Sequence, residues 1–121
     1  MEYEELTGKI IGAAMEVHNT LGPGFLEGVY QDALELELRT RGISFETQQE
    51  LQIAYKGAPL KHKYKPDFMV EGKVIVEIKA VTQLTDVDLA QTINYLKATS
   101  YKVALLISFS GRSLEWKRLV L

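Results

Sequence analysis

Residues 65–81 read KPDFMVEGKVIVEIKAV, and this stretch constrains the fold more than any other part of the chain. Two runs rich in Val, Ile, Phe and Tyr, at 64–70 and 73–80, are separated by a Glu-Gly pair. Apolar runs of this length around a glycine turn predict a β-hairpin. Because side chains alternate between the two faces of a strand, Glu77 and Lys79 are expected to share one face.

The length of the hairpin loop decides whether Asp67 joins that face. A two-residue loop would pair Asp67 with Val76 and send Glu77 to the other side. A three-residue loop, residues 70–72, pairs Asp67 with Ile75 and puts a glycine where such loops need a left-handed residue. The opposite face would then be apolar, with Phe68, Val70, Val74, Val76 and Ile78. A one-residue slip would bury Asp67 without a partner, so we predict an odd loop or bulge, with both acids and Lys79 on one edge.

Composition limits the classes of protein that the chain can represent. It has 121 residues, a common size for one domain, so we expect a single domain over 1–121. There are no cysteines, which excludes disulfides, thiolate catalysis and zinc–sulfur sites. No apolar run is long enough to span a bilayer, and the acidic start is unlike a signal peptide, which together predict a cytoplasmic protein. The net charge is −2, so any phosphate-binding surface must be local.

The rest of the chain predicts helices packed against a sheet. Apolar residues recur at helical spacing near the N-terminus, and Gly42 and the Thr85–Asp88 capping box mark the ends of two further helices. The expected elements are helix 3–20, helix 25–41, strand 43–55, turn 56–59, the hairpin within 61–80, a helix opening at 85–88, strand 101–109 and strand 114–120. This order predicts an α/β (α+β) sandwich with a mixed β-sheet flanked by helices.

Three motifs give the chain a family resemblance. The Lys65-Pro66-Asp67 and Glu77-Ile78-Lys79 pair, on this order of elements, resembles the PD-(D/E)XK nuclease superfamily, also called restriction-endonuclease-like. Its αβββαβ core would here carry one extra N-terminal helix and a C-terminal strand. Gly24-x-x-Glu27-x-x-Tyr30 resembles the small prokaryotic GxxExxY family, and Gln91-x-x-x-Tyr95 resembles the RecB-like branch.

The resemblance implies a metal site on the hairpin. Asp67, Glu77 and the backbone carbonyl of Ile78 would hold Mg²⁺ or Mn²⁺, which prefers oxygen ligands and activates water beside a phosphodiester. Lys79 would orient or deprotonate that water, or stabilise charge electrostatically, and the sequence leaves these roles open. The alternative for this trio is a charge cluster on an edge strand. Glu27 would complete the metal site or, alternatively, interact only with its helix dipole.

Six further residues are candidates for contact with nucleic acid or water. Gln91 would lie near the attacking water or a phosphate and Tyr95 against a sugar or base, the alternative being a surface Gln and a half-buried Tyr. Tyr30 either packs with a hydrogen-bonded hydroxyl or contacts substrate. Strand alternation puts Lys61, Lys63 and Lys65 on the face of Asp67, where they would bind phosphates. Alternatively they form a solvated edge that blocks aggregation.

These residues lead to two expectations of function. The first is a Mg²⁺- or Mn²⁺-dependent nuclease acting on nucleic acid, with DNA favoured over RNA by the resemblance alone. A chain this short leaves no room for a specificity domain, so a homodimer or a larger complex is a further expectation. The second is a nucleic-acid-binding or protein-interaction module on a nuclease fold without turnover, because fold does not fix function.

Overall fold

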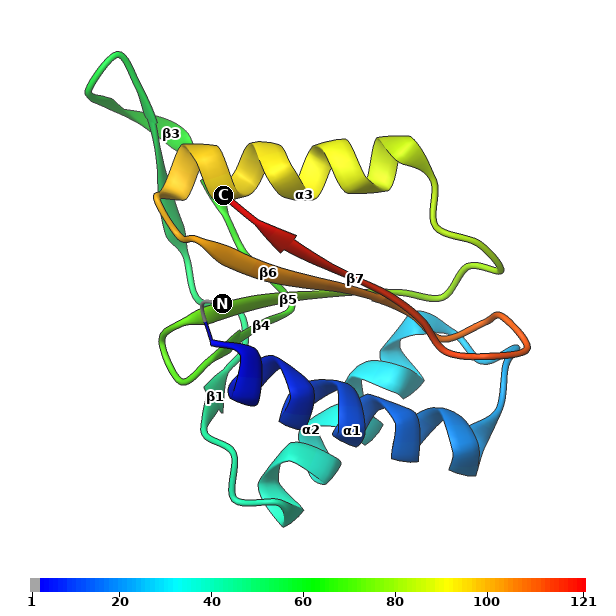
Figure 1. The fold of residues 1–121 in the computed structure, drawn as a ribbon. Coiled ribbons are helices and arrows are strands. Elements are labelled where there is room, and N and C mark those ends of the chain that lie inside the picture. The colour runs from blue at the N-terminus through cyan, green and yellow to red at the C-terminus, as the bar shows by residue number, and fades with distance from the viewer. Residues whose placement is uncertain (1–2) are drawn as a thin grey trace.

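A computed structural model describes residues 3–121, and it has three layers: two helices, a five-stranded sheet, and a third helix on the other face (Figure 1). The strand order of the sheet is β1-β4-β5-β6-β7. The strands are β1 (Phe45–Glu46), β4 (Phe68–Val70), β5 (Val74–Lys79), β6 (Val103–Ser108) and β7 (Glu115–Val120). Only the central β5–β6 pair is parallel, so the sheet is mixed, as predicted.

The helices begin and end close to the residues expected from the sequence. They are α1 (Glu4–Leu21), α2 (Glu27–Thr40) and α3 (Asp86–Thr99). Gly42 follows α2 at φ +70°, the left-handed position that ends a helix, and Thr85 and Asp88 form the expected capping box at the start of α3. No helix within residues 3–121 is long and apolar enough to cross a membrane.

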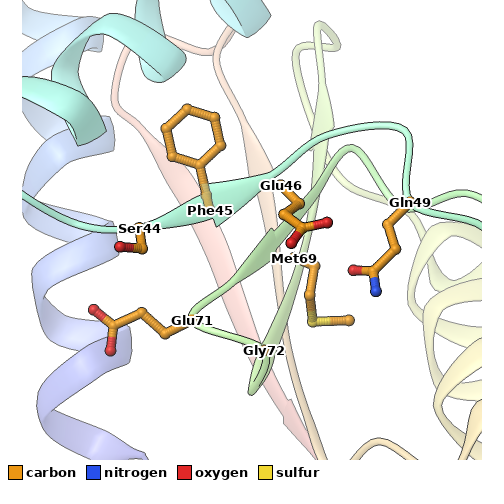
Figure 2. Close-up of a pocket in the computed structure, with 7 residues that line it drawn as sticks. All are labelled: Ser44, Phe45, Glu46, Gln49, Met69, Glu71 and Gly72. Atoms are coloured by element: carbon orange, nitrogen blue, oxygen red, sulfur yellow. The ribbon is translucent and has the colours of Figure 1, made fainter.

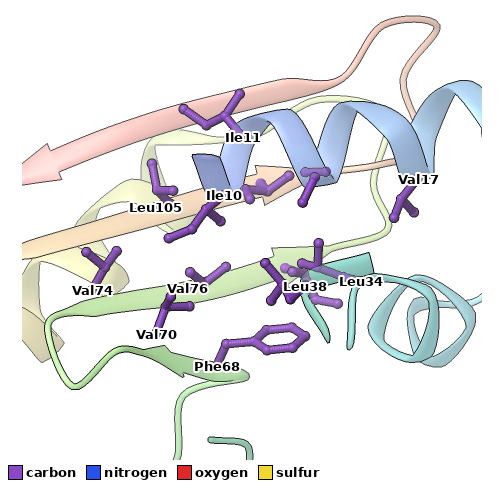
Figure 3. Close-up of a cluster of buried hydrophobic side chains, with 14 of the residues drawn as sticks. Ile10, Ile11, Val17, Leu34, Leu38, Phe68, Val70, Val74, Val76 and Leu105 are labelled. Carbon is purple, nitrogen blue, oxygen red and sulfur yellow. The ribbon is translucent and has the colours of Figure 1, made fainter. Parts of the chain in front are cut away.

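The first face of the sheet carries the larger core (Figure 3). Apolar side chains of α1 and α2 pack there on Phe68, Val70, Val74 and Val76, the alternating residues that the sequence assigned to one face. On the second face, α3 packs on Met69, Ile75 and Ala104 through residues that include Leu96. Because β4 and β5 are covered on both sides, their polar ends at Asp67, Glu77 and Lys79 are the exception to an apolar hairpin.

The strand predicted over 43–55 is wrong, since the chain forms two separate strands there. β1 joins the main sheet, whereas β2 (Leu51–Tyr55) pairs antiparallel with β3 (Ala58–Tyr64) in a two-stranded sheet of its own. Between β1 and β2 the chain turns at Gln48, which has φ +62°. The turn predicted at 56–59 contains only Lys56 and Gly57 in the structure. We call residues 51–64 the ribbon; it lies between the first and second strands of the αβββαβ core.

The hairpin has a three-residue loop, as predicted, but one residue later than expected. Val70 pairs with Val74, so the loop is residues 71–73, with Glu71 and Gly72 at φ +52° and +65°. Extending this register brings Asp67 opposite Glu77, and the predicted partner Ile75 instead faces Met69. The shift moves each pairing by two residues, so the faces stay as predicted. The strand is also shorter than 64–70, because Pro66 has no N–H for a ladder bond.

Candidate active site

Two main-chain N–H groups hold the two acids of the motif close together. The Asp67 N–H donates to Glu77 Oε1 at 2.8 Å, and the Ile78 N–H donates to Asp67 Oδ2 at 2.8 Å. These bonds replace the strand ladder, which ends at the Phe68–Val76 pair. Each carboxylate therefore has one oxygen fixed by a main-chain donor and a second oxygen available for another ligand.

The backbone carbonyl of Ile78 points to the same side of β5 as the paired carboxylates. In an extended strand the N–H and C=O of one residue point to the same side. The Ile78 N–H points to Asp67, so its carbonyl also faces the Asp67 side, beyond the end of β4. The next carbonyl, that of Lys79, points the other way and accepts the Phe109 N–H at 3.0 Å. Oxygens of Asp67, Glu77 and Ile78 therefore converge at one edge of the sheet.

The site makes negative charge unfavourable. Burial raises the pKa of Glu77 to about 7, and the charge of Asp67 adds to this, against the lowering effects of the Asp67 N–H, Tyr64 and Lys79. Burial also raises the pKa of Asp67, opposed by the Ile78 N–H and by Lys79. Two half-buried carboxyls side by side favour a bound cation, because a cation would stabilise both charged forms.

Lys79 is half-buried beside these acids, across from Ser108 on β6. Its positive charge lowers the pKa values of Glu27, Asp67 and Glu77, so it lies close enough to act on all three. Among the ion pairs of residues 3–121, none shorter than 4.0 Å involves Lys79. Its ammonium is therefore not committed to a structural salt bridge.

Glu27 approaches the site from the other side, as the first residue of α2. Partial burial and the charge of Asp67 raise its pKa, and Lys79 lowers it. Within the described range 3–121, however, no three Asp, Glu or His side chains gather closely enough to hold a metal ion by themselves. Glu27 thus lies within electrostatic range of Asp67 without being brought into one ligand cluster with both motif acids.

Tyr64 and Gln31 are near the acids, and the sequence reasoning gave neither a role. The Tyr64 ring is buried and stacks on Tyr95 at 3.8 Å between centroids, with its hydroxyl toward Glu77. This contact influences the pKa of Glu77 but does not reach hydrogen-bond geometry within the described residues. Gln31, one turn after Glu27, donates to the Asp67 carbonyl at 3.4 Å. Nothing in the sequence pointed to a role for Tyr64, because it is a single aromatic residue inside a run of lysines.

The helix candidates of the Gln-x-x-x-Tyr motif are placed differently from each other. Gln91 is exposed and lines a surface pocket on α3 together with Val87, Asn94 and Tyr95. Tyr95 is half-buried, and its stacking on Tyr64 connects α3 to the Glu77 side of the site. The structure brings Tyr95 to the site through Tyr64, and it leaves Gln91 on the adjoining surface.

Tyr30 packs in the core, and the prediction of direct nucleic-acid contact is wrong in this structure. Its side chain has no exposed surface, and the ring stacks on Phe109 at 4.8 Å. The hydroxyl donates to the Gly22 carbonyl at 2.6 Å and accepts the Phe25 N–H at 3.2 Å. Tyr30 therefore fixes the loop that leads into Glu27.

The geometric reason given for the three lysines is also wrong. β3 ends at Tyr64 and β4 begins at Phe68, so alternation along one strand does not relate Lys61, Lys63 and Lys65 to Asp67. All three side chains are exposed, and Lys63 and Lys65 lie 3.9 and 3.5 Å from Glu50 carboxylate oxygens. Their contact with phosphates stays a prediction.

A pocket of about 280 Å³ lies at the opposite edge of the sheet, near the β4–β5 turn (Figure 2). Its lining is Ser44, Phe45, Glu46, Gln49, Met69, Glu71 and Gly72. Two of these side chains are acidic and none is basic, which is unsuited to a phosphate ligand. The acids of the motif do not line this pocket.

Helices on both faces of a mixed sheet, with two acids and a lysine at the end of its central hairpin, define a restriction-endonuclease-like fold. A family model described as the PD-(D/E)XK nuclease superfamily matches residues 4–119. The chain belongs to this superfamily, and the nucleases of the superfamily generally use divalent metals.

Comparison with solved structures supports the fold. The crystal structure of SSO0001 matches with a TM-score of 0.60 at 18% sequence identity, over 98% of this chain and 59% of that chain. The chain thus spans about 59% of the length of that protein, and at this identity the likeness concerns the fold alone. Among curated proteins, none gives a significant match.

The raised pKa of Glu77 predicts how the stability of the metal-free protein depends on pH. A carboxyl whose folded pKa is about 7, against 4.5 unperturbed, binds more protons when folded. The free energy of unfolding should therefore fall as pH rises from about 5 to 8. Urea titrations across this range should show the fall, and Glu77→Gln should flatten it. Glu46→Gln, which changes an exposed glutamate, should keep the slope; an unchanged slope in Glu77→Gln would contradict the assignment.

Proposed function

We propose that this protein is a Mg²⁺- or Mn²⁺-dependent nuclease that hydrolyses phosphodiester bonds in nucleic acid, with DNA as the substrate. The observation that carries the proposal is the pairing of Asp67 and Glu77 through main-chain hydrogen bonds, beside Lys79 at the end of the hairpin. We also place the chain in the GxxExxY branch, on Gly24, Glu27 and Tyr30. DNA over RNA rests on the superfamily resemblance.

The residues present fit a divalent cation. The donors are oxygens, one free oxygen on each carboxylate plus a carbonyl, and Mg²⁺ prefers such ligands while keeping several waters. When bound, the cation supplies Lewis-acid stabilisation of the phosphate and a more acidic water. Glu27 would join through its position at the start of α2, either directly or through a water.

The chain's own residues have separate roles in this proposal. Asp67 and Glu77 hold the cation, and their backbone bonds keep them oriented before it binds. Lys79 positions the attacking water and stabilises the negative charge that grows on the phosphate. The Tyr64 hydroxyl lowers the pKa of Glu77, and Gln31 holds the backbone at Asp67. Gln91 and Tyr95 would meet the substrate along α3.

A second candidate is a nucleic-acid-binding or protein-interaction module without turnover. It is favoured by the hydrogen bonds themselves, since each motif acid accepts a main-chain N–H and so has a structural use without metal. One simple measurement distinguishes the two candidate functions, namely the response of the protein's stability to divalent metal.

Divalent metal should stabilise the folded protein and permit cleavage. Mg²⁺ or Mn²⁺ at about 100 times its dissociation constant should add about 2.7 kcal/mol to the free energy of unfolding. Thermal melts with and without metal measure this, and Asp67→Asn should remove the shift. The matched control Asp32→Asn, an exposed acid on α2, should keep it.

The same samples should be tested on single- and double-stranded DNA and RNA, with Mn²⁺ and with EDTA. Cutting that needs metal and is lost in Asp67→Asn supports the nuclease. A folded protein that binds metal but does not cut would indicate a nuclease that needs a partner. A protein that neither binds metal nor cuts would favour the interaction module.

A further inference from the structure

The ribbon, residues 51–64, carries charge that the rest of the molecule does not share. Residues 51–66 contain four lysines, Lys56, Lys61, Lys63 and Lys65, and no Asp or Glu. The whole chain has a net charge of −2, so setting these four positive charges aside leaves −6 on the other residues. The ribbon with its two following residues is a positive arm on a negative body, which is the charge distribution of a local phosphate-binding surface.

Packing does not account for the length of the ribbon. The six residues of β3 before Tyr64 are all exposed, and on β2 only Leu51 and Ile53 contribute to the core of the second face. The Lys56-Gly57 turn lies beyond the C-terminal end of α3, clear of the main sheet (Figure 1). A two-stranded ribbon alone is marginally stable in water, so its exposed half adds little to the fold.

The exposed side chains are of the types that bind nucleic acid. Lys61 and Lys63 are exposed side chains on β3, beside an irregularity in its pairing with β2 between Lys63 and Pro59. At the turn, Tyr55 is 60% exposed, and the Lys56 ammonium lies 5.5 Å from its ring centroid.

The shape selects among nucleic acids. A two-stranded β-ribbon fits the major groove of B-form DNA, which is about 12 Å wide, whereas the minor groove is only about 6 Å wide. The major groove of double-stranded RNA is too narrow and deep for such an element. At its base the ribbon ends at Tyr64, which stacks on Tyr95 and faces Glu77, and Lys65-Pro66 then leads directly to Asp67. A duplex held by the ribbon would thus be adjacent to the acids.

We propose that the ribbon binds the major groove of double-stranded DNA and makes duplex DNA the substrate of this site. This inference rests on the proposed nuclease function, which identifies the site beside the ribbon as catalytic. Its test, however, measures nucleic-acid binding without catalysis. Lys61 and Lys63 contact phosphates at the groove edge, and the Lys56-Gly57 turn enters the groove together with Tyr55.

The test is binding in EDTA, where no cleavage occurs, of labelled DNA duplex, single-stranded DNA and RNA duplex of the same mixed sequence. The wild-type chain should bind the DNA duplex most tightly. Lys61→Ala/Lys63→Ala should weaken that binding about 10- to 100-fold near 0.1 M salt. It should also lower the slope of log affinity against log salt by about 1.8. Lys9→Ala/Lys73→Ala, with the same charge change on exposed residues outside the ribbon, should stay within about twofold of wild type.

Three results would overturn the inference. In the first, the ribbon variant binds duplex DNA as tightly as the control does. This result would refute the role of the ribbon in binding but would leave the nuclease proposal unaffected. In the second, the ribbon variant loses as much affinity for single-stranded DNA or for RNA duplex as it loses for DNA duplex. The lysines would then be a general phosphate contact, and the ribbon would not select DNA duplex. In the third, the wild type binds no nucleic acid at all, which refutes the nuclease proposal as well. Thermal melts of each variant should match wild type, since these side chains are exposed.

Discussion

Replacing Lys79 by alanine should lower the rate of metal-dependent cleavage by at least about 100-fold. Lys79 is close enough to both paired acids to lower their pKa values, and within residues 3–121 it forms no ion pair shorter than 4.0 Å. Its removal takes away the positive charge available to a water or a developing phosphate charge. The measurement is the single-turnover cleavage rate at saturating Mn²⁺, with metal binding followed in parallel by thermal melts.

Two further variants separate the possible roles of Lys79. Lys79→Arg keeps the charge but cannot give up a proton, so it should recover part of the rate if the role is electrostatic and none if Lys79 is a base. Lys73→Ala removes an exposed lysine from the turn of the same hairpin and should cleave like wild type. Equal rates for Lys79→Ala and Lys73→Ala would refute the assignment of Lys79 to the reaction.

Replacing Tyr30 by alanine should destabilise the protein by about 3–5 kcal/mol. The ring is fully buried against Phe109, and the substitution would leave a cavity between α2 and the end of β6. Tyr30→Phe should cost about 1–2 kcal/mol, because it keeps the stacking but leaves the Gly22 carbonyl without its donor. Urea unfolding followed by circular dichroism measures both values.

Tyr55→Ala is the matched control for Tyr30, because the same residue type is 60% exposed on the ribbon. It should change the free energy of unfolding by no more than about 0.5 kcal/mol. If Tyr30→Ala were as mild as this control, the residue would be dispensable for packing. The Gly-x-x-Glu-x-x-Tyr motif would then need a reason other than the fixing of the loop before Glu27.

The sequence predicted the faces of the central hairpin better than its register. Alternation has a period of two, so the loop could be misplaced by one residue, and each pairing by two, without moving Asp67 off the face of Glu77. The error arose at Glu71, which takes a left-handed conformation at φ +52° that its residue type does not signal. The family motifs identified which acids belong to the site. The alternation of side chains along the strands predicted that these acids share one face.

The ribbon and Tyr64 could not be predicted by the same reasoning. The chain leaves the main sheet at Gln48, where neither glycine nor proline marks a turn, so 43–55 resembled one strand. Tyr64 sits inside a lysine-rich run, and only the tertiary structure shows that it turns inward to Tyr95 while Lys63 and Lys65 stay outside. In both cases long-range packing, rather than local pattern, determined the result.

The closeness of Asp67 and Glu77 in sequence bears on when the site forms during folding. Glu77 is ten positions after Asp67, and their contact closes one short hairpin. The neighbouring parallel pair of Val74 and Val103 lies 29 positions apart in sequence, with α3 between them, and closing longer loops costs more entropy. The geometry proposed to bind the cation is thus local, whereas the sheet that supports it is not. A chain leaving the ribosome can bring the two acids together before β6 has been synthesised.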